Sequence, residues 1–467
     1  MAAIQTEEAP MTLTNVDHET LADGFAGELI VPGNPSYDEA RTIFNAMIDR
    51  RPAVIAQCAN SQDVSRAITF ARDSSLEVAV RGGGHGVAGK ALVDDGLVID
   101  MRRMNAVTVD PQARTATVGG GATMSDLDRA TEPHGLATTG GRVSTTGVAG
   151  LTLGGGNGWL DRKFGLACDN LLSVELVTAD GQTIRASDDE NAELFWALHG
   201  GGGNFGVATS FTFRLYELPS VTVGLLLWPF DEGPQVIRAY RDFMHDAPDE
   251  VCGGAVYLTG PPMEFVPEHL VGNNTAVVLV VYTGEEPAGR AAMAPMLSLR
   301  PHGEMIAEMP YAELQCLLDD PPGHRNYWSA TYLDSLPDEA IAVHSACAGD
   351  MIVPSPSQHA LAPQGGAIAR GRADYPIPWR QAPWFVLTFG MWDDPADDER
   401  GKRWAQGTRR ALSAWATDAV YLNFIGDEGQ DRVVAGLGAE NYRRLAAVKA
   451  QYDPENIFHL NHNIKPA

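Results

Sequence analysis

The spacing of apolar residues predicts two helices and two buried strands near the N-terminus. Apolar side chains recur every three or four positions in residues 34–49 and again in residues 61–73, where Ser61 is the expected N-cap. Short apolar runs at 53–58 and 78–80 have the length and composition of buried strands. This alternation of helices and strands indicates an α/β arrangement, and the second strand runs directly into a glycine-rich segment.

The next part of the chain alternates short strands with turns. Residues 96–100 and 106–119 have strand-like composition, and residues 124–134 have helical spacing. An Asp-Gly pair lies between apolar runs at 174–179 and 183–186. Because Asp-Gly is a strong signal for a tight turn, we expect these two runs to form a β-hairpin.

Beyond Leu218 the pattern changes to long apolar runs, which predict a second domain. Runs such as 276–282 and 384–392 are typical of strands, and segments with helical spacing, such as 233–247 and 288–299, lie between them. This order predicts an antiparallel sheet covered by helices.

The length of the chain supports this division. It has 467 residues, which is more than a single core usually supports, so two domains are expected. After residue 420 the pattern returns to a helix at 441–452 and a short tail. We therefore predict an α+β protein with a first domain, a second domain with the antiparallel sheet, and a C-terminal segment that returns to the first domain, spanning residues 1–218, 219–420 and 421–467.

Many of the 49 glycines are clustered, and each cluster lies beside a predicted strand. Such loops let another group approach the backbone closely, and their successive N–H groups can converge on an anion. One cluster alone would be typical of a flexible loop, but four indicate a large polyanionic ligand such as a dinucleotide. A formal G-x-G-x-x-G match at 201–206 precedes a strand, so the Rossmann mechanism does not apply. The clusters are Gly82–Gly84, Gly119–Gly121, Gly154–Gly156 with Gly158, and Gly200–Gly203 with Gly206.

A histidine, His85, follows the first cluster in the segment Arg-Gly-Gly-Gly-His-Gly. A lone loop histidine is commonly structural or solvated. A neutral imidazole is nucleophilic, however, and its ordinary pKa lies near working pH. Held rigidly by glycine loops, His85 is therefore a candidate for covalent attachment to a bound cofactor.

Charge and cysteine content restrict the expected partners. The net charge of −26, from 34 Lys+Arg against 60 Asp+Glu, repels nucleic acid and anionic lipid. The five cysteines form no CxxC pair, which argues against a zinc site or a disulfide framework and favours a reducing compartment, the cytoplasm. The segment up to Thr20 lacks the basic region of a secretory signal, and no apolar run has the length of a membrane span. We expect a small-molecule substrate, no nucleic acid, no membrane and no metal, while the oligomeric state is not indicated.

Five segments resemble the berberine-bridge-enzyme-like family, within the vanillyl-alcohol-oxidase type of FAD-binding proteins. The ordered set and its spacing cover nearly the whole chain, and bacterial members of secondary metabolism are the most similar. The resemblance implies a PCMH-type FAD-binding domain of two subdomains and a substrate domain with an antiparallel sheet covered by helices. The segments are RGGGHGVAG at 81–89, TTGVAGLTLGGGNGWL at 145–160, DRKFGLACDN at 161–170, WALHGGGGNFGVAT at 196–209 and YDPENIFHLNHNI at 452–464.

The resemblance also implies FAD, held covalently by an 8α-histidyl link to His85. Many family members have a second tether, a cysteine in a Cys-Pro-Thr-Val-Gly pattern. This chain has Val143 at that position, in Val-Ser-Thr-Thr-Gly, so we predict a single covalent link. Cys168 lies in a different motif and is expected to be a small buried residue.

The remaining FAD-binding residues follow from matching each motif to the family pattern. Among them, the small side chain of Thr146 suggests that O2 can reach the flavin, although simple packing beside the ring is an equal alternative. The implied residues are Arg81, Gly82, Gly83, Gly84, His85, Gly86, Gly89, Gly120, Thr145, Thr146, Gly147, Gly150, Gly154, Gly155, Asn157, Gly158, Asp169, Asn170, Gly202, Asn204, Phe205, Gly206, Val207, Asn461 and Asn463.

The resemblance assigns the catalytic base to Tyr421, the first residue of a Tyr-Leu-Asn-Phe segment. Oxidation of an alcohol needs a group that takes the hydroxyl proton, and a tyrosine must have its pKa lowered from about 10 to do so. A buried structural tyrosine is the alternative. Two departures from the family, Phe424 for a second tyrosine and Ser329-Ala330 for Lys-Ser, prevent any transfer of a substrate.

These residues together predict an FAD-dependent oxidase that takes hydride from a small alcohol, a sugar, or a phenol or polyketide and passes the electrons to O2. A flavin dehydrogenase with another electron acceptor and a catalytically idle flavin-binding protein are the alternatives. A nucleotide-binding module without flavin is a third.

Overall fold

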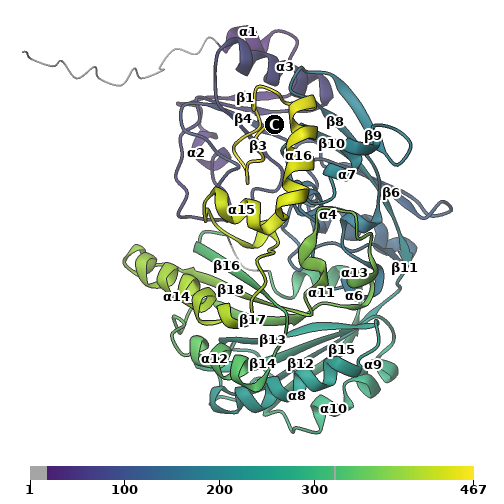
Figure 1. Ribbon diagram of the computed structural model, residues 1–467, viewed down its shortest axis with the longest axis vertical. Coiled ribbons are helices and arrows are strands. Elements are labelled where there is room, and N and C mark those ends of the chain that lie inside the picture. The colour runs from purple at the N-terminus through teal and green to yellow at the C-terminus, as the bar shows by residue number, and fades with distance from the viewer. Residues whose placement is uncertain (1–17, 320–321) are drawn as a thin grey trace, which may run out of the picture.

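The computed structural model describes residues 18–319 and 322–467, which form two lobes (Figure 1). The upper lobe in that view contains sheets of four and five strands, and the lower lobe contains one sheet of seven strands. The sequence predicts no secretory signal at the N-terminus. Residues 1–17 of that segment lie outside the described residues. In the described ranges, no helix is both long enough and apolar enough to cross a bilayer.

The four-stranded sheet confirms the predicted strand-helix-strand unit. Its strand order is β1-β2-β4-β3, in which β1 and β2 are antiparallel and the other pairs are parallel. Helix α3 (Ser61–Asp73) connects β2 to β3 and packs its apolar stripe on the sheet. Its N-cap is Asn60, whose side chain accepts from the Asp63 N–H, so the expected cap at Ser61 is wrong by one residue. The strands are β1 (Glu28–Ile30), β2 (Val54–Gln57), β3 (Val78–Arg81) and β4 (Leu97–Asp100).

The helix predicted over residues 34–49 is wrong, because only one turn forms, α2 (Tyr37–Ala40). The carbonyl oxygens of Ala40 and Thr42 accept hydrogen bonds from the guanidinium of Arg81 at the end of β3. A buried arginine thus uses backbone groups that a longer helix would have bonded internally. Tertiary contacts override the local helical pattern here.

The five-stranded sheet is antiparallel throughout, in the order β5-β6-β10-β8-β9. Strands β8 and β9 form the predicted hairpin, and Gly181 in its turn has a φ of +82°. A two-stranded sheet joins β7 to β11 beside it. The strands are β5 (Val107–Asp110), β6 (Thr115–Gly119), β7 (Leu136–Ala137), β8 (Leu171–Val177), β9 (Thr183–Ser187), β10 (Val207–Arg214) and β11 (Tyr216–Glu217).

The seven-stranded sheet is the antiparallel sheet expected in the middle of the chain. Its order is β15-β12-β14-β13-β17-β18-β16 and each neighbouring pair is antiparallel. All seven strands lie inside the interval 219–420, although the domain boundaries themselves stay a prediction. The strands are β12 (Val221–Pro229), β13 (Val251–Thr259), β14 (Asn274–Tyr282), β15 (Gly303–Met309), β16 (Arg325–Leu333), β17 (Gln358–Pro363) and β18 (Trp384–Trp392).

Helices cover the outer face of this sheet, along the bottom and both sides of the lower lobe (Figure 1). The apolar side of α8 packs with strand residues such as Trp228 and Val278 in one core cluster. The helix predicted over 288–299 is interrupted at Met293, which separates α9 from α10. The helices are α8 (Gly233–Asp246), α9 (Glu286–Ala292), α10 (Ala294–Leu297), α12 (Asp338–Ala348) and α14 (Asp398–Ala411).

The inner face of the same sheet packs against the upper lobe. Tyr332 of β16 and Phe385 of β18 belong to one core cluster with Phe211 of β10 and Leu153 of the glycine-rich segment. The C-terminal helices α15 (Gln430–Leu437) and α16 (Ala439–Tyr452) return to the upper lobe (Figure 1). The two lobes are therefore joined by a continuous apolar core.

Short helices occupy the remaining connections. They are α1 (Glu19–Ala22), α4 (Met124–Thr131), α5 (Val148–Leu153), α6 (Asp161–Phe164), α7 (Ala192–Ala197), α11 (Tyr311–Cys316) and α13 (Gly366–Arg370), and the 3₁₀ turns η1 (Glu132–His134), η2 (Cys168–Asn170), η3 (Phe230–Glu232), η4 (Pro378–Gln381), η5 (Pro395–Asp397), η6 (Ser413–Trp415) and η7 (Leu422–Phe424).

Candidate functional site

A cavity of about 340 Å³ lies where the glycine clusters, the seven-stranded sheet and the C-terminal tail meet. Residues of all four predicted glycine clusters line it. Trp328 and Phe389, which face each other across β16 and β18, contribute aromatic walls from the second sheet. The tail contributes Phe458, Leu460 and the residues that follow. The sequence motifs therefore converge on one cavity.

Two of the glycine-rich loops touch through their backbones. A Cβ atom on Gly83 would lie 2.5 Å from the Gly147 nitrogen, and one on Gly147 would lie 2.4 Å from the Gly83 nitrogen. No side chain fits at either position without moving backbone. This contact places the loop that carries His85 directly against the Thr145–Gly147 turn.

His85 lies on the loop after β3, at the wall of the cavity. Its ring stacks on Phe44 with centroids 3.9 Å apart, and its Nε2 atom is 3.3 Å from the Thr145 hydroxyl. Burial lowers the pKa of His85 to about 4. The imidazole is therefore neutral near pH 7 and keeps the electron pair that a nucleophile needs.

Arg81 and Asn45 hold this loop in place. The Arg81 guanidinium donates to the carbonyls of the residue 40–42 segment, as described above. The amide of Asn45 donates to the Val87 carbonyl at 2.9 Å and to the Asn326 carbonyl at 3.0 Å, and its oxygen accepts from the Asn326 N–H. Because Asn326 lies in β16, Asn45 ties the His85 loop to the second sheet.

Tyr421 lies in the cavity wall, but its surroundings do not lower its pKa as a base requires. The hydroxyl donates to the Leu151 carbonyl at 3.1 Å and accepts from the Gly156 N–H and the Asn423 amide. Burial outweighs these bonds and raises the pKa of Tyr421. The hydroxyl is thus protonated at neutral pH, and the assignment of Tyr421 as the base stays a prediction.

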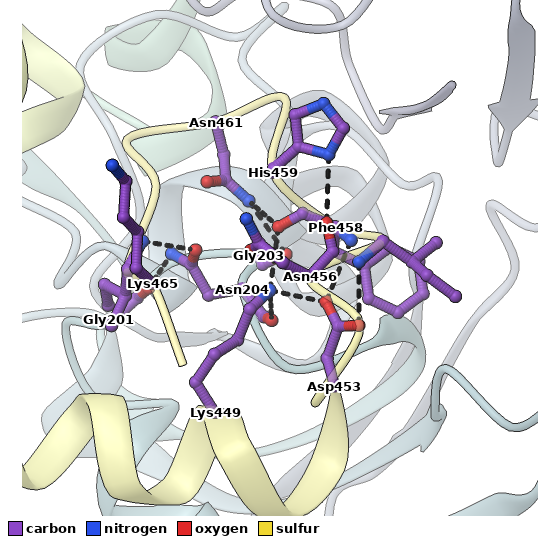
Figure 2. A network of polar contacts seen from close by, with 12 residues as sticks. Gly201, Gly203, Asn204, Lys449, Asp453, Asn456, Phe458, His459, Asn461 and Lys465 are labelled. Carbon is purple, nitrogen blue, oxygen red and sulfur yellow. Dashed lines mark hydrogen bonds and ion pairs between the residues drawn. The ribbon is translucent and has the colours of Figure 1, made fainter. Parts of the chain in front are cut away.

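A buried lysine joins the tail to the fourth glycine cluster (Figure 2). The ammonium of Lys449 donates to the Asn204 carbonyl at 2.7 Å, to the Phe458 carbonyl at 3.0 Å and to the carboxylate of Asp453. The Asn204 side chain in turn bonds the tail through the Ile464 N–H. Both charges of the Lys449–Asp453 pair are fully buried. This network fixes two segments of the cavity wall against each other.

The structure brings sixteen of the predicted site residues to the cavity. They come from each of the predicted motifs except the segment at 161–170. They are Gly82, Gly83, Gly84, His85, Gly86, Gly120, Thr146, Gly147, Gly150, Gly154, Asn157, Gly202, Asn204, Gly206, Tyr421 and Asn461.

The other predicted residues do not line the cavity. Some support it, such as Arg81 and Thr145. Others lie elsewhere: Asp169 pairs with Arg380 at 2.8 Å, and Asn170 accepts from the Tyr216 hydroxyl. The residues outside the lining are Arg81, Gly89, Thr145, Gly155, Gly158, Asp169, Asn170, Phe205, Val207 and Asn463.

Several lining residues were not predicted from the sequence. Trp328 and Phe389 carried a weak signal, because each is an aromatic residue within a strand-like stretch. Other side chains gave no local signal, because long-range packing brings them to the cavity. The missed residues with polar or aromatic side chains are Lys90, Arg142, Trp328, Phe389, Asn423, Phe424, Phe458 and His462.

Family models and known proteins match the chain. Residues 52–187 match the FAD binding domain family, and residues 420–465 match the family described as berberine and berberine like. The chain is 32% identical to (R)-6-hydroxynicotine oxidase of Paenarthrobacter nicotinovorans, over 94% of this chain and 97% of that protein. It is 30% identical to an uncharacterized FAD-linked oxidoreductase of Bacillus subtilis, with the same coverage.

Solved structures show the same fold. The crystal structure of 6-hydroxy-D-nicotine oxidase from Arthrobacter nicotinovorans superposes with a TM-score of 0.83 at 30% identity, covering 95% of this chain and 98% of that one. The BBE-like 1 protein of Physcomitrella patens superposes with a TM-score of 0.86 at 21% identity, covering 97% and 99%. The α+β fold predicted from the motifs is confirmed.

The buried lysine network gives a first prediction. Lys449→Met leaves the Asp453 carboxylate buried without its partner, so the free energy of unfolding falls by about 3–5 kcal/mol. Urea denaturation followed by circular dichroism measures it. Lys402→Met is the matched control, because Lys402 pairs with an exposed Glu399 and should cost less than about 1 kcal/mol. An equal decrease in the free energy of unfolding of both variants would show that the buried Lys449 network does not stabilise the fold.

Proposed function

The chain belongs to the FAD-linked oxidoreductases of the berberine-bridge-enzyme-like family, and from this membership we propose that it is an oxidase with FAD attached covalently to His85. Its substrate is a small alcohol, sugar or phenol-type compound, and the electrons pass to O2. The observation that carries the proposal is the neutral imidazole of His85 in the wall of the glycine-lined cavity.

The residues present fit a flavin dinucleotide. The glycine loops put no Cβ atoms into the cavity, so a ligand can approach their backbone closely. The N–H groups of Gly200, Gly201 and Gly202 donate to carbonyls of the chain, so close approach is what these glycines offer. The buried Oδ1 atom of Asn461, a lining residue, has no hydrogen-bond partner in the described ranges and is available to a ligand. His85, the glycines of the first and fourth clusters, Thr146 and Asn461 would hold the cofactor. Bound FAD supplies the two-electron acceptor for the oxidation.

A single covalent link is supported by what surrounds the position of the family's second tether. Val143 lines the cavity there and has no nucleophilic atom. Cys168 is fully buried, is not among the lining residues, and has a thiol pKa raised well above its usual range by burial. Neither residue can replace the missing cysteine, so His85 is the attachment point that remains.

Oxygen as the electron acceptor is supported by two observations. Thr146, whose side chain is small, lies in the cavity wall. A relative that is 32% identical over nearly its whole length is named an oxidase.

The covalent link is tested by denaturation. After acid precipitation, the visible flavin absorbance of the wild-type protein should stay with the pellet, whereas that of His85→Ala should be released or absent, because the nucleophile is gone. His134→Ala, at an exposed histidine of η1, is the control and should retain its flavin. Wild-type protein that releases its flavin contradicts covalent attachment, and retention by His85→Ala removes His85 from this role.

The oxidase assignment is tested by reoxidation. A panel of alcohols, sugars and phenols first identifies a compound that bleaches the flavin anaerobically. Mixing the reduced protein with aerated buffer in a stopped-flow instrument should restore the absorbance within one turnover time. Reoxidation much slower than turnover would identify a dehydrogenase with another acceptor, and no bleaching by any compound would favour an idle flavin-binding protein.

The proton-transfer role of Tyr421 is tested by Tyr421→Phe. Because burial keeps the hydroxyl protonated, we expect the rate of anaerobic bleaching to fall less than about tenfold and its pH profile to stay unchanged. The flavin content should also stay that of the wild type. A loss of about 10²–10⁴-fold together with a lost pH dependence would instead establish Tyr421 as the base.

A further inference from the structure

The charged side chains of the cavity are cationic in a chain that is strongly acidic. The protein carries 60 Asp+Glu against 34 Lys+Arg, yet no aspartate or glutamate occurs among the described residues that line the cavity. Lys90 and Arg142 are the lining residues with a permanent positive charge. The cavity therefore attracts anions although the whole molecule repels them.

The two cations differ in their partners. Lys90 forms an ion pair with Asp427, whose carboxylate is 2.7 Å away, so its charge is neutralised. Among the described residues, Arg142 forms no ion pair, and the side-chain partner of its guanidinium is the neutral amide of Asn157. Two acidic side chains lie near this loop. Asp161 accepts from the Asn157 amide, the Gly158 N–H and the Cys252 thiol, and Asp319 accepts from the N–H and the hydroxyl of Ser144. Both carboxylates are bonded to other donors, so the guanidinium of Arg142 keeps a donor free for a ligand.

The guanidinium of Arg142 is held rigidly. Its Nε atom donates to the Asn157 side-chain oxygen at 3.1 Å, and its Cζ atom lies 4.4 Å from the ring centroid of Trp159. Its Nη2 atom is buried and has no hydrogen-bond partner in the ranges 18–319 and 322–467. A buried donor on a charged group is costly to leave unpaired, so its position indicates a missing acceptor.

Aromatic side chains also line the cavity. Trp328, Phe389 and Phe424 line the cavity from β16, β18 and the segment after Tyr421, and Trp328 and Phe389 pack edge to face with centroids 4.7 Å apart. An apolar wall with one fixed, unpaired guanidinium matches an organic anion that has a planar apolar body.

We propose that Arg142 binds an oxyanion of the substrate, a carboxylate or a phenolate on an aromatic or otherwise apolar body. This inference rests on the proposed function, because it places that substrate in the flavin cavity. It assigns the chain to acidic substrates instead of neutral sugars. Arg142 acts as a specificity-determining residue, and it takes no part in the transfer of electrons or protons.

Ligand binding to the yellow protein tests the assignment without turnover. Benzoate, 4-nitrophenolate and neutral benzamide are titrated while the visible flavin spectrum is followed. We expect at least one of the two anions to bind ten times more tightly than benzamide, and the stronger anion shows whether a carboxylate or a phenolate is preferred. Arg142→Gln should weaken the binding of that anion at least tenfold and leave benzamide unchanged, while Arg142→Lys should recover part of the loss.

Arg185→Gln is the matched control, because it removes one arginine charge from an exposed ion pair with Glu190 and should leave all three titrations unchanged. Equal affinity for the anions and benzamide, or wild-type anion binding by Arg142→Gln, overturns the inference. So does Arg142→Gln protein with reduced flavin content, because the guanidinium would then serve the cofactor. Colourless wild-type protein would instead overturn the proposed function itself.

Discussion

The close approach of two backbone segments, at Gly83 and Gly147, is the constraint on which the site depends. Each glycine occupies space that a Cβ atom on the other would need. Their contact places His85 beside Thr145 and aligns two glycine loops along one wall of the cavity. Without it, the imidazole and the loops would still exist in the sequence, but they would not face a common ligand. The absence of a side chain at these two glycines therefore lets the two backbones pack together, in addition to making the loops flexible.

Two buried polar side chains, Asn45 and Lys449, hold the segments around the cavity together. Asn45 ties the loop of His85 to β16 of the second sheet, and Lys449 ties the fourth glycine cluster to the C-terminal tail. Each of these two side chains donates hydrogen bonds to backbone carbonyls of segments that are far apart in the sequence. They bond the loop carbonyls of Val87, Asn204 and Phe458, so these buried backbone groups are satisfied outside regular secondary structure. The cavity wall is therefore rigid although much of it lacks regular secondary structure.

The distribution of charge separates the surface of the protein from its interior site. The acidic side chains that give the net charge of −26 are absent from the described cavity lining, where Lys90 and Arg142 stand instead. An acidic surface repels polyanions, whereas the cavity favours a small anion. Neutral His85 and protonated Tyr421 add no charge there, because burial shifts the pKa of each toward its uncharged form.

The sequence by itself determined the features that depend on neighbouring residues. The hairpin at Asp180-Gly181, helix α3 and the glycine clusters were all predictable, because turn chemistry, apolar spacing and missing side chains act locally. The ordered motifs also indicated FAD as the cofactor and His85 as its predicted attachment residue. Tertiary structure alone decided the rest. It ended the helix expected at 34–49, because Arg81 takes its carbonyls, and it brought Arg142 to the cavity with an unpaired nitrogen. It also raised the pKa of Tyr421 by burying its hydroxyl. Burial and long-range hydrogen bonds set these properties, and a linear pattern does not record which distant groups will surround a side chain.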